Sequence, residues 1–161
     1  ILHFSDSEMD FQYRTWLESA RTHVPDTFPG MRELLQRYHA AGGHICVVSH
    51  SVPETILRDY RAHDLPTPEL IGWDDDPERR KPAPWPIYQI EHALGLQPEQ
   101  LVVIDDLKPG KDMADRAGVD FIAAGWTHTV PHIIETMQRI SPHYCRTVAE
   151  LTALLLDETE A

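Results

Sequence analysis

Short apolar runs alternate with amphipathic stretches along most of the chain. Runs of about four apolar residues, many of them β-branched, are typical of buried strands. They predict strands at 1–4, 44–49, 101–104 and 120–124, a weaker one within 69–72, and a last one that begins near residue 144. Between them, apolar residues recur at helical spacing, which predicts helices over 11–24, from about 28 to 41, and over 53–63, 85–94, 111–117, 130–140 and the end of the last segment to 156.

Capping residues and breakers support several of these boundaries. Ser5, Asp6 or Ser7 can cap the first helix, and Pro25 ends it. Gly42 and Gly43 terminate the second helix, because glycine adopts the left-handed conformation that closes a helix.

Strands that alternate with helices predict an α/β fold. The expected architecture is a three-layer, doubly wound parallel sheet, with helices on both faces and right-handed crossovers. With 161 residues, a single domain spanning 1–161 is expected, and it is large enough to bury a sound core.

The composition restricts the class of partner. A hydrophobic content of 42% and a charged content of 25% are ordinary for a globular protein, and the net charge of −12 argues against nucleic acid and anionic membranes as partners. A phosphorylated substrate stays open, because a metal ion and a local lysine can overrule the global charge. No apolar run approaches the roughly 20 residues of a membrane span, and no signal peptide is visible. Cys46 and Cys145 lack metal-binding spacing; reduced thiols in a cytoplasmic protein are expected, with a disulfide as the alternative.

Asp105 and Asp106 are the first candidate site. They end the apolar run 101–104, and in open α/β sheets ligands bind at the carboxyl ends of strands. Two adjacent carboxylates repel each other unless a cation neutralises their charge, and Mg²⁺ prefers such oxygen ligands. The alternative is a strand that ends in a solvated acidic turn.

Two further residues are candidates for holding a phosphate. Ser49 follows the apolar run 45–48, where a hydroxyl and the backbone donors of a tight turn can cradle a phosphate oxygen; the alternative is a simple helix cap. Lys81 precedes Pro82-Ala83-Pro84, which holds the backbone extended and stiff, although lysines in charged loops are usually solvated. Asp112 is interpreted as a first-turn helix residue, and the ten histidines as surface or loop residues, with only His50 near the predicted site.

Together these motifs resemble the haloacid dehalogenase superfamily, in the branch that contains phosphoglycolate phosphatases. Pro29-Gly30 resembles the entry to the helix before that family's second motif. Ser49 matches the second motif, Lys81 the third and Asp105-Asp106 the fourth, and Ala117-Gly118-Val119 follows as in the family. The resemblance implies that Ser49 binds phosphate, that Lys81 supports the nucleophile and the phosphate, and that Asp105 and Asp106 hold Mg²⁺. One departure is Gly110, where many members place a further Asp or Asn.

The larger departure concerns the nucleophile. The family places it in an Asp-x-Asp-Gly-Thr motif at the end of the central strand, and no segment of this chain matches it. The helix at 11–24 resembles the last helix of the cap that such proteins carry, so 1–27 is interpreted as the end of a helical cap. The first strand, the nucleophile and most of the cap are then expected before Ile1. The alternative is a divergent member that uses Asp6, or one without catalysis.

The implied reaction is hydrolysis of a small phosphorylated metabolite through an aspartyl-phosphate intermediate, with Mg²⁺ as cofactor. Two other classes of protein share part of this pattern. A response-regulator receiver domain has its acidic pair after the first strand, whereas here the pair follows the hydroxyl and lysine motifs. A binding or scaffold protein would keep the fold and the metal or phosphate site but lack the nucleophile.

Overall fold

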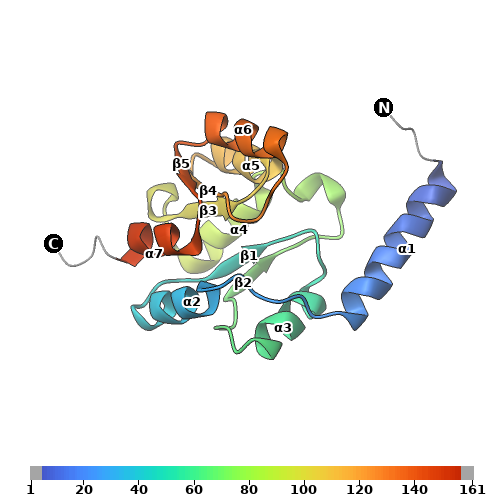
Figure 1. Ribbon diagram of the computed structural model, residues 1–161, viewed down its shortest axis with the longest axis horizontal. Helices are drawn as coiled ribbons and strands as arrows, with labels where there is room; N and C mark the ends of the chain where they lie inside the picture. Colours follow the sequence, from blue (N-terminus) through green and yellow to red (C-terminus); the bar gives the residue numbers. More distant parts are fainter. Residues whose placement is uncertain (1–4, 157–161) are drawn as a thin grey trace.

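The computed structural model describes residues 5–156, without the side chain of Asp6 (Figure 1). The strand predicted at 1–4 therefore lies outside the described residues. The described strands form two parallel ladders, which confirms the predicted α/β class.

One ladder pairs β1 (Cys46–Val48) with β2 (Leu70–Gly72), so that Val47 lies opposite Ile71. The other contains β3 (Val102–Asp105), β4 (Asp120–Ala124) and β5 (His143–Cys145) in that order. The strands within each ladder are parallel. Among the described residues no backbone pairing joins β1 to β3, so the sheet is interrupted between them.

Helices cover both faces of the larger ladder, as the doubly wound prediction requires. Alternate residues of β4 point to opposite faces. Ile122 packs with α2 (Met31–Ala40) and α7 (Val148–Leu156), through Leu34 and Leu151. Phe121 and Ala123 pack instead against α5 (Lys108–Ala117) and α6 (Pro131–Ile140).

The remaining helices complete the two outer layers. A third cluster of buried residues joins α4 (Trp85–Leu94) to α5 through Ile87, Ile90 and Met113, and Cys46 and Val48 of β1 pack against it. Helix α3 (Pro53–Ala62) lies beside α2, where Arg32 and Gln36 contact Asp64 just after α3. Two short 3-10 turns, η1 (Pro77–Arg79) and η2 (Pro98–Gln100), precede α4 and β3.

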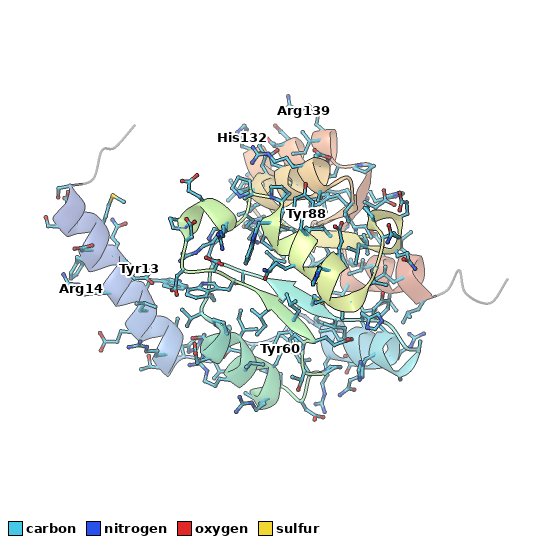
Figure 2. All side chains as sticks on the ribbon, turned by 180° about the vertical axis from the view of Figure 1, so that it is seen from behind. Tyr13, Arg14, Tyr60, Tyr88, His132 and Arg139 are labelled. Carbon is cyan, nitrogen blue, oxygen red and sulfur yellow. The ribbon has the colours of Figure 1, made fainter. Side chains whose placement is uncertain are left out.

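Helix α1 (Asp6–Thr22) extends away from the sheets and the other helices (Figure 1). It starts earlier than the predicted 11–24, because Ser5 and Glu8 form a reciprocal capping box. The hydrogen bonds from Ser5 also lower the pKa of Glu8. Its carboxyl end is fixed by Arg58 of α3, which donates to the carbonyls of Arg21 and His23. Figure 2 shows Tyr13 and Arg14 of α1 at a distance from the strands.

The prediction that α5 starts at residue 111 was wrong by one turn. The helix begins at Lys108, since Pro109 suits a first helical turn, where no backbone donor is needed. Both cysteines are free thiols, as expected. No helix within residues 5–156 is long and apolar enough to cross a membrane.

Candidate active site

Lys81 and Asp105 form the central contact of the candidate site. The Lys81 Nζ atom donates to Oδ2 of Asp105 at 2.6 Å, and the two side chains are only 17% and 11% exposed. The backbone N–H of Leu107 donates to the other oxygen, Oδ1, at 3.0 Å. The loop that follows β2 is thereby tied to the carboxyl end of β3, so two of the predicted site residues are brought together.

The loop before α4 is held so that Lys81 reaches this position. The Arg80 guanidinium donates to the carbonyls of Asp74 and Asp75 and lies 5.0 Å from the centre of the Trp73 ring. These contacts fold residues 74–80 back on Trp73, at the end of β2. The Lys81–Pro82 peptide bond that follows is cis. Arg80 is therefore a positioning residue that the sequence interpretation did not identify.

Asp106 is held from the loop after β4. Thr127 donates from Oγ1 to Oδ2 of Asp106 at 3.0 Å, and Nε2 of His128 lies 2.7 Å from the same oxygen. The interpretation of every histidine except His50 as remote from the site was therefore wrong for His128. Thr127 and His128 follow the apolar run of β4, so the rule that ligands bind at the carboxyl ends of strands could have identified them.

Gly110 has a packing role that explains its departure from the family pattern. It is buried in the first turn of α5, and a Cβ atom there would overlap the side chain of Asp105. A larger residue at position 110 would have to displace Asp105. The close approach of α5 to β3 therefore depends on glycine.

Ser49 lies just after β1, at its carboxyl end, as predicted, but among the described residues no hydrogen bond joins it to Lys81 or Asp105. Its Oγ accepts a hydrogen bond from the N–H of Ser51 at 3.0 Å. The charges of Lys81 and Asp105 both affect the pKa of the neighbouring residue His50. Partial burial lowers the pKa of His50, the charges of Lys81 and Arg80 lower it further, and Asp105 opposes them.

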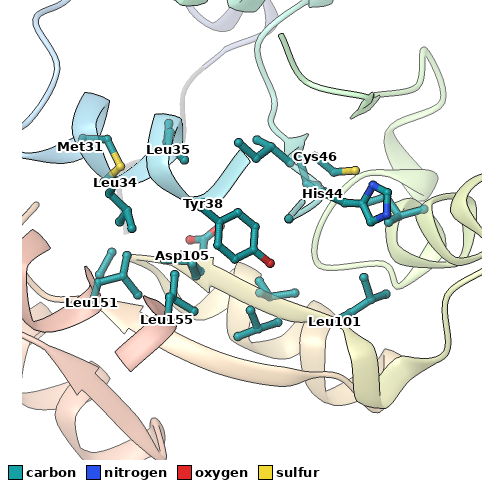
Figure 3. Close-up of a pocket in the computed structure, with 18 of the residues that line it drawn as sticks. Met31, Leu34, Leu35, Tyr38, His44, Cys46, Leu101, Asp105, Leu151 and Leu155 are labelled. Atoms are coloured by element: carbon teal, nitrogen blue, oxygen red, sulfur yellow. The ribbon is translucent and has the colours of Figure 1, made fainter. Parts of the chain in front are cut away.

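A cavity of about 810 Å³ opens between the two ladders and reaches Asp105 and Asp106. Figure 3 shows Asp105 and Tyr38 within it, with Leu34 and Leu35 on one side and Leu151 and Leu155 on another. Its wall is largely apolar, and Asp105 and Asp106 are among its polar lining residues.

The carboxylates fit part of a Mg²⁺ site. Within residues 5–156, both contacts to the Asp106 carboxylate are made to its Oδ2 atom. Its Oδ1 atom is therefore available to bind a cation. Magnesium is commonly held by one or two carboxylates and completes its shell with water and substrate phosphate oxygens. Residues 5–156 contain no group of three acidic, histidine or cysteine side chains placed to hold a metal ion. Asp112, interpreted as a helix residue, lies in α5 and pairs with Lys108.

Comparisons with known proteins agree with the motifs. A family model described as haloacid dehalogenase-like hydrolase matches residues 2–124. Hexitol phosphatase A from Escherichia coli (strain K12) is 28% identical over 132 residues, which cover 81% of this chain and 61% of that protein. Enolase-phosphatase E1 from Pseudomonas fluorescens (strain Pf0-1) is 30% identical over 95 residues, 57% of this chain and 41% of that protein. The chain therefore spans less than two thirds of either relative.

A solved structure shares the fold. A predicted phosphoglycolate phosphatase from Haemophilus somnus 129pt superposes with a TM-score of 0.73 at 19% identity, covering 94% of this chain and 68% of that one.

The influence of Lys81 on His50 gives a direct test of the site's geometry. Replacing Lys81 with methionine removes a positive charge and leaves Asp105 unpaired, and both changes favour protonated His50. We expect Lys81→Met to raise the pKa of His50, because the charge of Lys81 lowers it in the unaltered chain. NMR titration of the imidazole ring measures this change. Lys108→Met, which removes an exposed lysine paired with Asp112, should leave that pKa unchanged. An unaltered His50 titration in Lys81→Met would show that the two residues are not neighbours.

The same shift has a defined effect on stability. Because the pKa of His50 is lower in the folded chain, its contribution to stability is complete above the ordinary pKa of 6.5. That contribution is lost as the pH falls below this value towards the folded pKa.

Proposed function

The chain belongs to the haloacid dehalogenase-like hydrolase family, and we propose that it carries most of the active site of a Mg²⁺-dependent phosphatase. The observation that carries this proposal is the largely buried Lys81–Asp105 pair, with Asp106 beside it, at the carboxyl end of β3. A largely buried lysine–carboxylate pair beside a second, partly exposed carboxylate forms a site suited to an anion and a cation together.

In this proposal Ser49 and Lys81 hold the phosphoryl group of the substrate. Lys81 supplies positive charge, and the Ser49 hydroxyl and the backbone donors after β1 supply hydrogen bonds. Because Lys81 already contacts Asp105, a phosphate oxygen must share its ammonium group, which has three donors.

Asp105 and Asp106 are proposed to hold the metal ion. When bound, Mg²⁺ would neutralise charge on the phosphate oxygens. Thr127 and His128 orient Asp106 through Oδ2, while Lys81 and the Leu107 N–H fix Asp105. The protein thus supplies positioning and electrostatic stabilisation, which account for most of the catalysis in phosphoryl transfer.

The nucleophile is proposed to be an aspartate on a strand that precedes Ile1, forming an aspartyl-phosphate intermediate. Residues 1–27, with α1, are proposed as the end of a helical cap. The alternative nucleophile, Asp6, stands at the start of α1, and its side chain lies outside the described residues.

The relatives named for phosphatase activity support a small phosphorylated metabolite as substrate. The free thiols support a cytoplasmic location, and the charge of −12 supports the expectation of neither nucleic acid nor membrane as partner.

One observation favours a second function. Within residues 5–156, Lys81 contacts one carboxylate, Asp105, and Thr127 and His128 contact one carboxylate, Asp106. Both aspartates are proposed to hold the metal ion, so neither is available as the nucleophile. A non-catalytic protein that binds Mg²⁺ or phosphate through the same residues is therefore the alternative.

The metal site can be tested by thermal stability. At a Mg²⁺ concentration about 100 times the Kd, binding stabilises the folded state by about 2.7 kcal/mol, or roughly 5–10 °C in Tm for a chain of this length. Asp106→Asn should abolish the increase, whereas Glu99→Gln, which removes an acid from η2, should preserve it. An equal Mg²⁺ response in Asp106→Asn and the unaltered chain would remove the metal assignment.

Hydrolysis of p-nitrophenyl phosphate separates the two functions. Turnover requires a carboxylate within about 3–3.5 Å of phosphorus. The chain Ile1–Ala161 should therefore hydrolyse this substrate slowly or not at all, and a longer chain with an upstream Asp-x-Asp strand should hydrolyse it in a Mg²⁺-dependent way. Fast turnover by Ile1–Ala161 that is lost on Asp6→Asn would place the nucleophile at Asp6 instead. An inactive longer chain that still binds Mg²⁺ would favour the binding protein.

A further inference from the structure

The loop that carries Lys81 is attached to helix α5 as well as to β3. The Nη1 atom of Arg116, in the last turn of α5, donates to the carbonyl of Pro82 at 3.0 Å. The hydrogen bonds of Arg80, by contrast, lie within the loop, because they end on two of its own carbonyls. Arg80 therefore gives the loop its shape, whereas the hydrogen bond from Arg116 fixes the place of the loop relative to the rest of the fold.

Helix α5 is itself held firmly against the elements that form the site. In its first turn, Gly110 lies so close to Asp105 that a Cβ atom would overlap that side chain. In its middle, Met113 is 1% exposed and packs with buried residues of α4. At its end, the Tyr88 hydroxyl of α4 donates to the backbone carbonyl of Arg116 at 3.4 Å. A helix anchored at these points is a rigid support for a side chain in its last turn.

One helix thus acts on both partners of the central ion pair. Gly110 limits the position of Asp105, and Arg116, about 9 Å further along the helix axis, holds the residue that follows Lys81. Because the proline ring fixes φ, holding the carbonyl of Pro82 restricts the direction in which the chain leaves Lys81. A lysine side chain is long and flexible, so a fixed backbone limits the positions that its ammonium group can reach.

We propose that Arg116 is a positioning residue for Lys81. Through the Pro82 carbonyl it keeps the loop at the distance from β3 at which the ammonium group of Lys81 meets Asp105. Within residues 5–156 the Arg116 side chain has no hydrogen bond to either member of the pair, so its effect passes through the loop. The consequence for phosphate binding rests on the proposed function, whereas the positioning of Lys81 does not. The other interpretation is a surface hydrogen bond of an exposed arginine that fixes nothing beyond itself.

The titration of His50 reports the place of Lys81, because the charges that shift the His50 pKa are those of Lys81, Arg80 and Asp105. Arg116→Met removes the donor and keeps the stem, and the exposed position should tolerate the change. When the loop loosens, the ammonium group leaves Asp105, and we expect the His50 pKa to rise in the direction that Lys81→Met gives. NMR titration of the imidazole ring measures this rise.

Two further variants serve as controls. Arg116→Lys keeps a donor of nearly the same reach, so its His50 pKa should lie closer to that of the unaltered chain than the value in Arg116→Met does. Arg139→Met removes a matching exposed arginine from the last turn of α6 (Figure 2), and it should leave the pKa unchanged.

A double variant separates positioning from a direct effect of charge. In Lys81→Met the loop no longer carries an ammonium group, so the addition of Arg116→Met should not raise the His50 pKa further. A further rise would mean that Arg116 acts on His50 without Lys81, and it overturns the proposal. The proposal is also overturned if Arg116→Met leaves the pKa unaltered, if Arg116→Lys gives the same value as Arg116→Met, or if Arg139→Met raises the pKa equally.

Binding of tungstate, a mimic of phosphate, connects this positioning to the proposed function. Measured by calorimetry, Arg116→Met should bind tungstate about threefold more weakly or worse, the scale of one lost hydrogen bond, and Arg139→Met should bind it as the unaltered chain does. If Lys81→Met weakens tungstate binding and Arg116→Met does not, the proposal is overturned. If the unaltered chain does not bind tungstate and the His50 titrations follow the expected pattern, the positioning role is supported and the phosphate site is contradicted.

Discussion

The Lys81–Asp105 ion pair joins the two halves of the strand arrangement. Lys81 belongs to the loop that leaves β2, and Asp105 ends β3, so the pair bridges ladders that share no backbone hydrogen bonds within the described residues. Both charges are largely removed from water, and this is tolerated because each neutralises the other and the Leu107 N–H satisfies the second carboxylate oxygen. Loss of one partner from such a pair costs on the order of 3 kcal/mol, since the other charge is left unpaired.

Several other features of the site depend on this pair. Arg80 and Trp73 hold the loop so that the lysine reaches the strand end, and Gly110 lets α5 approach the aspartate closely. Asp106 can lie next to Asp105 because Lys81 balances one of the two negative charges. These residues come from the loop after β2, the end of β3 and the start of α5, which is why catalysis or binding at this edge requires the complete fold.

Much of the fold could be predicted because local signals mark its elements. The bounds of α4 and β4 match the predicted 85–94 and 120–124, since Pro84 and Gly95 flank the helix and a continuous apolar run marks the strand. The position of Thr127 and His128 after β4 marks them as candidates, but their contact with Asp106 joins segments far apart in the chain and has no local signal. The role of Arg80 arises from the folding of a loop and has no local signal either. The interruption of the sheet between β1 and β3 could not be predicted from the sequence either. Apolar runs identify strands but do not say which strands are neighbours.

The central claim is that the carboxyl ends of β1 and β3 and the loop after β2 form one phosphate site. The most direct measurement is a crystal structure of the chain with tungstate, a phosphate mimic that is located by its anomalous scattering. The account predicts a single tungstate with oxygens about 2.7–3.2 Å from both Ser49 Oγ and Lys81 Nζ, beside Asp105 and Asp106. Tungstate bound elsewhere, with Ser49 still engaged only by the Ser51 N–H and Lys81 only by Asp105, would contradict it.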